Sequence, residues 1–176
     1  GSQFLATDKR GIPTSYYGTE SGLGVLIASL MKERPAMNVG AIGLGVGTIA
    51  AYGRSNDSIT FYEINPDVRG AAERFFTYLK DSPAKVEVVL GDARLSLERG
   101  APRGFDLLVA DAFSGDAIPV HLVTKEAWEL YLSHLKADGV IAFHISNTYL
   151  DLRPVILRIA KGLGLKATII KSEGQE

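Results

Sequence analysis

Apolar positions along the chain fall into two kinds of block. Six short runs rich in valine, isoleucine, leucine and alanine are typical of strands, and several are apolar throughout, as expected for strands buried on both faces of a sheet. They lie at 39–42, 59–63, 86–90, 105–110, 140–145 and 167–171. Helical patterns separate most of them, and this alternation predicts a parallel sheet covered by helices.

The helices between these strands can be located from their first residues. Asn65 precedes Pro66 and Asp67, while Thr124 and Asp151 each precede a periodic segment, and side chains of these types cap helix N-termini. We therefore expect helices at 66–79, at 125–136 and from 152 to 162 or 164. A further helix is expected at 21–33.

Together these elements predict an α/β fold with a Rossmann-like, doubly wound and mostly parallel sheet. A length of 176 residues suits one domain. Residues 1–2 are typical of an expression-tag remnant, and 3–37 form a separate N-terminal segment with its own helix. Residues 38–176 are expected to form the Rossmann-like nucleoside-binding domain.

Composition narrows the classes of function. The net charge is −1 and no run of Lys or Arg occurs, so we expect no nucleic-acid partner. The chain has no cysteine, which excludes disulfides and thiolate zinc sites and favours the cytoplasm. No apolar stretch reaches the roughly 18 residues of a membrane span, so we expect no membrane contact by this segment. The three histidines lack metal-ligand spacing, and we expect no metal.

The first strand leads into the glycine-rich stretch "GLGVGTIAAYG" at 43–53. Gly43, Gly45 and Gly47 permit a tight turn and a close approach of the backbone to a ligand, whose charged part would rest on the helix that follows. The third glycine of the dinucleotide pattern Gly-x-Gly-x-x-Gly is replaced by Thr48. A strand-to-helix turn packed against a neighbouring segment would use the same residues.

Acidic residues follow the second and third strands. Glu63 lies 20 residues after Gly43, where a carboxylate accepts hydrogen bonds from ribose hydroxyls. Asp92 follows the third strand and, with the backbone N–H of Ala93, has the groups needed to bind the polar edge of an adenine. Because a dinucleotide fold needs no acid at that point, we rank S-adenosyl ligands first and an NAD-dependent dehydrogenase second.

Two further acids follow the fourth strand and suggest a cationic second substrate. Asp111 ends that strand and Asp116 lies in the next loop; such carboxylates orient a protonated amine and accept its proton. Tyr16 and Tyr17, before a glycine turn, are candidates to line an amine pocket through cation–π attraction. His144 is expected to be a hydrogen-bonded buried residue within the fifth strand, with a position in the crevice near the end of that strand as the alternative.

The chain resembles the spermidine synthase-like (polyamine aminopropyltransferase) family of the S-adenosylmethionine-dependent methyltransferase superfamily. The resemblance covers 14–165 and rests on the order and spacing of six blocks. These are "PTSYYGTESGLG", "GLGVGT", "FYEINP", "GDAR", "FDLLVADAFSGDAIP" and "ADGVIAFHISN". It implies a sheet of the class I methyltransferase type, and it is strongest with a bacterial branch in which such domains occur alone or fused to membrane segments.

The same resemblance implies a reaction and a role for several residues. An aminopropyl group would pass from decarboxylated S-adenosylmethionine to an amine such as putrescine, and methylthioadenosine would be released. Glu63 matches the family's ribose-binding acid, Asp92 with Ala93 its adenine-binding pair, and Asp111 its catalytic aspartate. Tyr16 or Tyr17 matches a tyrosine of the substrate-side N-terminal segment.

Three departures from the family pattern keep other functions open. Val46 replaces an acid that selects the decarboxylated donor, which favours a methyltransferase using S-adenosylmethionine and releasing S-adenosylhomocysteine. Ser114 replaces the family's second aspartate, and Asp116 follows two residues later. We also expect this chain to lack the family's N-terminal β-domain, apart from its last stretch, and the last strand of the sheet. A homo-oligomer that covers the sheet edge, or an inactive adenosyl-binding domain of a larger membrane-fused protein, would fit that pattern.

Overall fold

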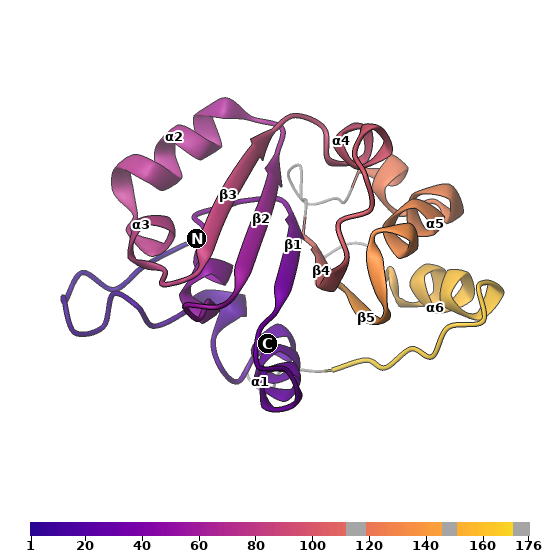
Figure 1. Ribbon diagram of the computed structural model, residues 1–176, viewed down its shortest axis with the longest axis horizontal. Coiled ribbons are helices and arrows are strands. Elements are labelled where there is room, and N and C mark those ends of the chain that lie inside the picture. The colour runs from indigo at the N-terminus through magenta and orange to yellow at the C-terminus, as the bar shows by residue number, and fades with distance from the viewer. Residues whose placement is uncertain (112–118, 146–150, 171–176) are drawn as a thin grey trace.

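A computed structural model of the chain describes residues 1–111, 119–145 and 151–170. Within them, five parallel strands form one sheet in the order β3-β2-β1-β4-β5 (Figure 1). The strands are β1 (Asn38–Ile42), β2 (Ser58–Glu63), β3 (Lys85–Leu90), β4 (Phe105–Ala110) and β5 (Leu135–Phe143). This confirms the Rossmann-like, class I methyltransferase-type sheet and the first four predicted strands.

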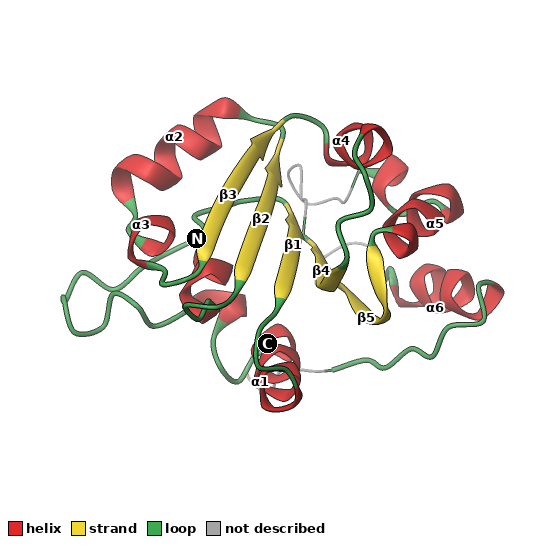
Figure 2. Cartoon of the chain, viewed as in Figure 1, coloured by secondary structure: helices red, strands yellow, loops and turns green. Residues whose placement is uncertain are grey.

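Helices cover both faces of the sheet (Figure 2). The α-helices are α1 (Gly22–Glu33), α2 (Pro66–Phe75), α3 (Tyr78–Asp81), α4 (Ala93–Arg99), α5 (Lys125–Ser133) and α6 (Arg153–Gly162). Short 3-10 helices are η1 (Ser15–Tyr17), η2 (Thr48–Tyr52) and η3 (Val120–Leu122). Within the described parts of the chain, no helix is long and apolar enough to cross a bilayer.

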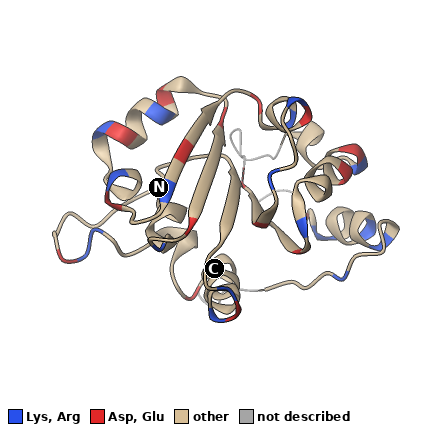
Figure 3. Ribbon diagram, viewed as in Figure 1, with Lys and Arg blue, Asp and Glu red and all other residues tan. Residues whose placement is uncertain are grey.

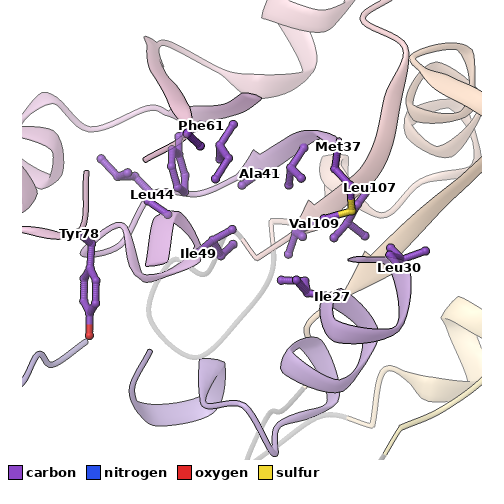
Figure 4. Packing of buried hydrophobic residues seen from close by; sticks show 14 of the residues in the cluster. Ile27, Leu30, Met37, Ala41, Leu44, Ile49, Phe61, Tyr78, Leu107 and Val109 are labelled. Carbon is purple, nitrogen blue, oxygen red and sulfur yellow. The ribbon is translucent and has the colours of Figure 1, made fainter. Parts of the chain in front are cut away.

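One core lies between the sheet and the layer formed by α1, η2 and α3. Ile27 from α1 and Ile49 from η2 pack against Phe61, Leu107 and other inward-facing strand residues (Figure 4). A second core lies on the opposite face of the sheet. It contains Leu97 of α4 together with Ala127 and Tyr131 of α5. Trp128 and Tyr131 of α5 are both buried, 3% and 0% exposed.

Charged side chains lie mainly on the helices and loops, where both signs are interspersed (Figure 3). One of the buried carboxylates is that of Asp106, which is 2% exposed at the amino-terminal part of β4. Its carboxylate accepts from the backbone N–H of Asn38 at 2.7 Å and pairs with Arg34 and Lys136. This cluster ties α1, β1, β4 and β5 together near the amino-terminal ends of β1 and β4.

The predicted helix 66–79 is interrupted, so this prediction is wrong in part. α2 ends at Phe75, and α3 begins at Tyr78. The interruption is caused by Gln3, whose side chain accepts from the backbone N–H of Thr77 at 3.0 Å and donates to its hydroxyl at 2.9 Å. A contact between residues 74 positions apart thus replaces the local helical bonding.

Residues 167–170 do not form the predicted sixth strand, and Lys171 lies outside the described residues. This segment is extended and returns beside Gly22 at the start of α1 (Figure 1). A cavity of about 430 Å³ separates it from β5, since residues of both line its walls. An extended segment becomes a strand only when its backbone groups pair with a neighbour, and here the cavity prevents pairing with β5.

The ends of the fifth strand and of the preceding helix also differ from prediction. α5 stops at Ser133 rather than at 136, because the chain joins the sheet at Leu135, opposite Phe105. β5 then ends at Phe143, so His144 and Ile145 lie beyond it. The helix at 93–99 was not anticipated, whereas α1 with its Ser21 cap and α6 agree with the sequence.

Candidate functional site

The carboxyl ends of the central strands lie in one row. Ile42 at the end of β1 pairs with Tyr62 of β2 on one side and with Ala110 of β4 on the other. The next residues along these strands are Gly43, Glu63 and Asp111, so they are neighbours at the same edge. Strand order reverses between β1 and β4, and open α/β sheets bind ligands in the crevice outside such a reversal.

The glycine loop turns through left-handed backbone conformations, with φ of 98° at Gly43, 54° at Gly45 and 82° at Gly47. A Cβ on Gly47 would lie 2.7 Å from Leu79 Cδ2, so this glycine is needed for packing. Beside Gly45 a Cβ would meet no atom within 4 Å, which leaves open space for a ligand. A helix was expected after the loop. The structure has the short 3-10 helix η2 there, which begins directly after Gly47.

Glu63 is the last residue of β2 and its carboxylate joins the glycine loop to the start of α2. Oε2 accepts from the backbone N–H of Leu44 at 3.0 Å, and Oε1 accepts from that of Asn65 at 2.8 Å. The residue is 8% exposed. Each carboxylate oxygen has a second lone pair. The group can therefore order the loop and still accept a hydrogen bond from a sugar hydroxyl.

Asp92 and Ala93 lie at the next strand end. The backbone N–H of Gly91 donates to the Glu63 carbonyl at 2.9 Å, which places the β3 end beside the β2 end. Asp92 caps α4 by accepting from the Leu95 N–H at 2.9 Å, and its other oxygen lies 3.3 Å from His121 Nε2. Its side chain is 22% exposed, so the carboxylate faces solvent in part while its cap bond fixes its orientation.

Asp111 is the first residue after β4 and is held by a backbone hydrogen bond to Ile42 at 2.9 Å. Only 6% of its side chain is exposed. Its Oδ1 lies 2.7 Å from His144 Nδ1, the one hydrogen bond to this carboxylate within the described residues. Burial raises the pKa of the Asp111 carboxyl above its usual range, and the hydrogen bond and charge of His144 partly offset that effect.

The tyrosine pair approaches the same point from the N-terminal segment. The Tyr16 ring lies 4.5 Å from the His144 ring and 4.6 Å from that of Tyr17, measured between centroids. Burial and the negative charge of Asp111 raise the pKa of Tyr16. Tyr16, Tyr17 and His144 also line one end of the cavity of about 430 Å³ between α1, β5 and α6. Asp116 lies outside the described residues.

His144 adds a group to the site that the sequence ranked second for this residue. It was expected first as a buried residue inside the fifth strand and alternatively in the crevice near the end of that strand; β5 ends one residue earlier and 22% of its side chain is exposed, which agrees with the alternative. The available signal was its position: it follows the fifth strand as Asp111 follows the fourth. Side chains at successive strand ends of a parallel sheet share one edge.

Comparison with known proteins places this geometry in a family. No protein-family model matches the chain. A polyamine aminopropyltransferase from Vibrio vulnificus is 32% identical over 130 residues, covering 70% of this chain and 41% of the relative. An N-terminal histidine N-methyltransferase from Emericella nidulans is 36% identical over 116 residues, covering 62% of this chain and 20% of the relative. The chain thus spans less than half the length of these curated relatives.

Solved structures agree on the fold. A spermidine synthase from Thermotoga maritima superposes with a TM-score of 0.57 at 19% identity, over 72% of this chain and 44% of that one. Human methyltransferase-like protein 13, in complex with S-adenosylhomocysteine (SAH), gives a TM-score of 0.60 at 23% identity, over 76% and 65% of the two chains. At these identities the two structures show the fold that this chain shares with them.

Proposed function

Because the chain belongs to the spermidine synthase-like family of the S-adenosylmethionine-dependent methyltransferase fold, we propose that it is an aminopropyltransferase acting on an amine. One observation carries the proposal. Asp111 is a buried carboxylate with one hydrogen-bond partner among the residues that the structure describes, placed at the strand-order reversal beside the glycine loop. A buried acid of this kind is complementary to a cation, and an amine substrate arrives as one.

The donor would lie across the row of strand ends. The open space beside Gly45 gives room for the tail of the donor, and Glu63 offers its remaining lone pairs to the ribose hydroxyls. Asp92, held by its cap bond, and the backbone N–H of Ala93 would bind the adenine edge. The residues present therefore fit an adenosyl sulfonium, with every polar group supplied by a strand end or a helix start.

In this reaction the protein has to align the amine with the donor and remove one proton from the amine. The protonated amine loses a proton to the Asp111 carboxylate, and the nitrogen lone pair forms a bond to the propyl carbon attached to sulfur. The carbon–sulfur bond breaks and its electron pair stays on sulfur, giving neutral methylthioadenosine. The sulfonium is already a good leaving group, so positioning the amine in line accounts for much of the rate.

A methyltransferase that uses S-adenosylmethionine itself is the second candidate. Val46, where the aminopropyltransferase pattern has an acid, packs against the core instead of presenting a charge to the donor. The relative named as an N-terminal histidine N-methyltransferase supports the same alternative. In that reaction Asp111 would again accept the proton of an amine, but the transferred group would be methyl.

Calorimetry and turnover assays on the wild-type chain separate these functions. An aminopropyltransferase binds decarboxylated S-adenosylmethionine and methylthioadenosine more tightly than the carboxylated donor, whereas a methyltransferase shows the reverse order. Turnover is then measured over a panel of amines with each donor. Binding without turnover of any amine would leave an adenosyl-binding domain without activity.

Asp111→Asn is the matching variant. It keeps the shape of the side chain but cannot accept the proton, so we expect turnover to fall about a hundredfold or more while methylthioadenosine binding changes little. Asp67→Asn, an exposed site in the first turn of α2, is the control and should keep full activity. Unchanged turnover in Asp111→Asn would remove this residue from the reaction.

A further inference from the structure

Asp111 and His144 are held side by side by the backbone rather than by their side chains alone. Ala110 and Phe143 are register partners at the ends of β4 and β5. The backbone N–H of His144 donates to the Ala110 carbonyl at 3.1 Å, as that of Asp111 donates to Ile42. The ladder therefore continues one residue past both strands, and the two side chains start from adjacent, fixed positions.

The ring of Tyr16 packs against the imidazole of His144. The two rings lie 4.5 Å apart with an interplanar angle of 30°. Tyr16 follows Ser15, whose φ of 58° is rare for a residue other than glycine. The neighbouring Tyr17 carbonyl accepts a hydrogen bond from the hydroxyl of Tyr52, whose pKa burial raises to about 12. The N-terminal segment is thus anchored where it contacts His144, which restricts rotation of the imidazole.

We propose that His144 is a positioning residue for Asp111: it fixes the carboxylate through Oδ1 and so directs Oδ2 towards the amine. This inference rests on the proposed function. An ionised carboxylate only accepts hydrogen bonds, so Nδ1 must carry the proton that is shared across the 2.7 Å contact. Within the described residues Oδ2 has no other partner, and it is the oxygen left to take the amine proton.

The same contact favours the ionised form of Asp111, the form that can accept a proton. Burial raises the pKa of this carboxyl, and the His144 hydrogen bond acts in the opposite direction. Among the described residues, the other ionisable side chains that line the cavity beside His144 are Tyr16, Tyr17, Arg153 and Lys166. Tyr16 stays neutral near pH 7 because its pKa is raised, and Arg153 is paired with Asp151 at 2.7 Å.

Two substitutions of equal shape isolate the role of the donated proton. Asparagine and leucine have the same branching, but only asparagine can donate to Asp111 from near the position of Nδ1. In His144→Leu we expect kcat near pH 7 to fall about tenfold to a hundredfold, the range expected for one charge-assisted hydrogen bond. The acid limb of its pH–rate profile should move to higher pH. His144→Asn should restore most of kcat and the position of the acid limb, while KM for the donor stays within about twofold in both.

A measurement without turnover separates failure of this inference from failure of the proposed function. Aspartate carboxyls labelled with ¹³C are titrated by NMR, and the Asp111 signal is identified by its loss in Asp111→Asn. We expect this carboxyl to titrate higher in His144→Leu than in the wild type, and close to the wild type in His144→Asn. If the wild type transfers nothing to any amine but the titration shifts, the function is wrong and the Asp111–His144 coupling stands.

Equal acid limbs and equal titrations in His144→Leu and the wild type would overturn the inference. His144→Ala is the replacement should the leucine variant not fold, since it removes the donor without adding bulk. The same two readouts then decide, with His144→Asn as the reference that retains a donor.

Discussion

Glu63→Gln perturbs the junction between the glycine loop and α2 without changing the size of the side chain. In the wild type both carboxylate oxygens accept backbone N–H groups, from Leu44 at 3.0 Å and from Asn65 at 2.8 Å. A glutamine side chain has one carbonyl oxygen and one NH2 group. One of the two backbone donors must therefore face another donor.

The expected cost follows from that mismatch. A buried donor left without an acceptor costs about 1–3 kcal/mol, and the bond that remains loses its charge assistance. We expect the free energy of unfolding to fall by about 2 kcal/mol, which corresponds to a Tm decrease of about 4–8 °C for a chain of this size. Glu73→Gln is the control, because it breaks only a surface pair with Arg69 and should cost about 0.3–0.5 kcal/mol.

Urea unfolding and calorimetry with methylthioadenosine measure the two consequences. Replacing one oxygen of the charged ribose acceptor by an NH2 group should weaken binding about tenfold or more, if Glu63 has the role proposed above. Equal unfolding free energies for the two glutamine variants would refute the structural reasoning. Reduced stability with unchanged affinity would instead limit Glu63 to ordering the loop.

Two further predictions concern stability. Asp106→Asn should lower the free energy of unfolding by about 3–5 kcal/mol, because Arg34 and Lys136 lose a buried partner. The control is Asp138→Asn, which changes the exposed partner of Arg34 and should cost less than about 1 kcal/mol. Urea unfolding at pH 7 measures both. Burial opposes ionisation of Asp106, but its hydrogen bonds from Asn38, Lys136 and Arg34 outweigh that effect and lower its pKa. The stabilisation by Asp106 is therefore fully present above the ordinary aspartate pKa and is lost as pH falls through the lowered value. A stability difference between Asp106→Asn and the wild type that failed to shrink on acidification would contradict this. Gly47→Ala should lower the free energy of unfolding by about 1–2 kcal/mol or more, because it places an alanine in the left-handed backbone region and its Cβ against Leu79. Gly70→Ala, on the exposed face of α2, should instead raise it by about 0.5–1 kcal/mol. Thermal unfolding of the two variants measures both effects.

The parts of the fold that sequence predicted are those set by local pattern. β1, β2 and β4 are apolar-rich runs buried along nearly their whole length because helices cover both faces of the sheet, and β3 is a similar but half-exposed run at the sheet edge. The acids Glu63, Asp92 and Asp111 could be placed for the same reason: each follows a run of that kind, and parallel strands bring their carboxyl ends to one edge. Strand order itself was not needed for that step.

What the sequence missed depends on contacts between distant segments. The break after α2 comes from Gln3 bonding to Thr77, and no local propensity signals it. Thr168, Ile169 and Ile170 have β-branched side chains typical of a strand, but pairing requires a neighbour, and the cavity lies between this segment and β5. The β propensity of this segment does not produce a strand, because no neighbouring strand in the described part of the chain is hydrogen-bonded to it.

The same distant contacts set the chemistry of the site. Tyr78 donates its hydroxyl hydrogen bond to the Ile12 carbonyl at 3.0 Å, and Tyr52 donates to the Tyr17 carbonyl, so the body of the domain holds the N-terminal segment in place. That segment carries Tyr16 onto His144, and His144 in turn contacts Asp111. Strand ends decide where the acid lies, but the protonation and orientation of that acid depend on residues from β5 and from the first 17 positions of the chain. Variants that release the N-terminal segment should therefore alter the behaviour of Asp111 without touching it, because they free the imidazole on which its ionised form depends.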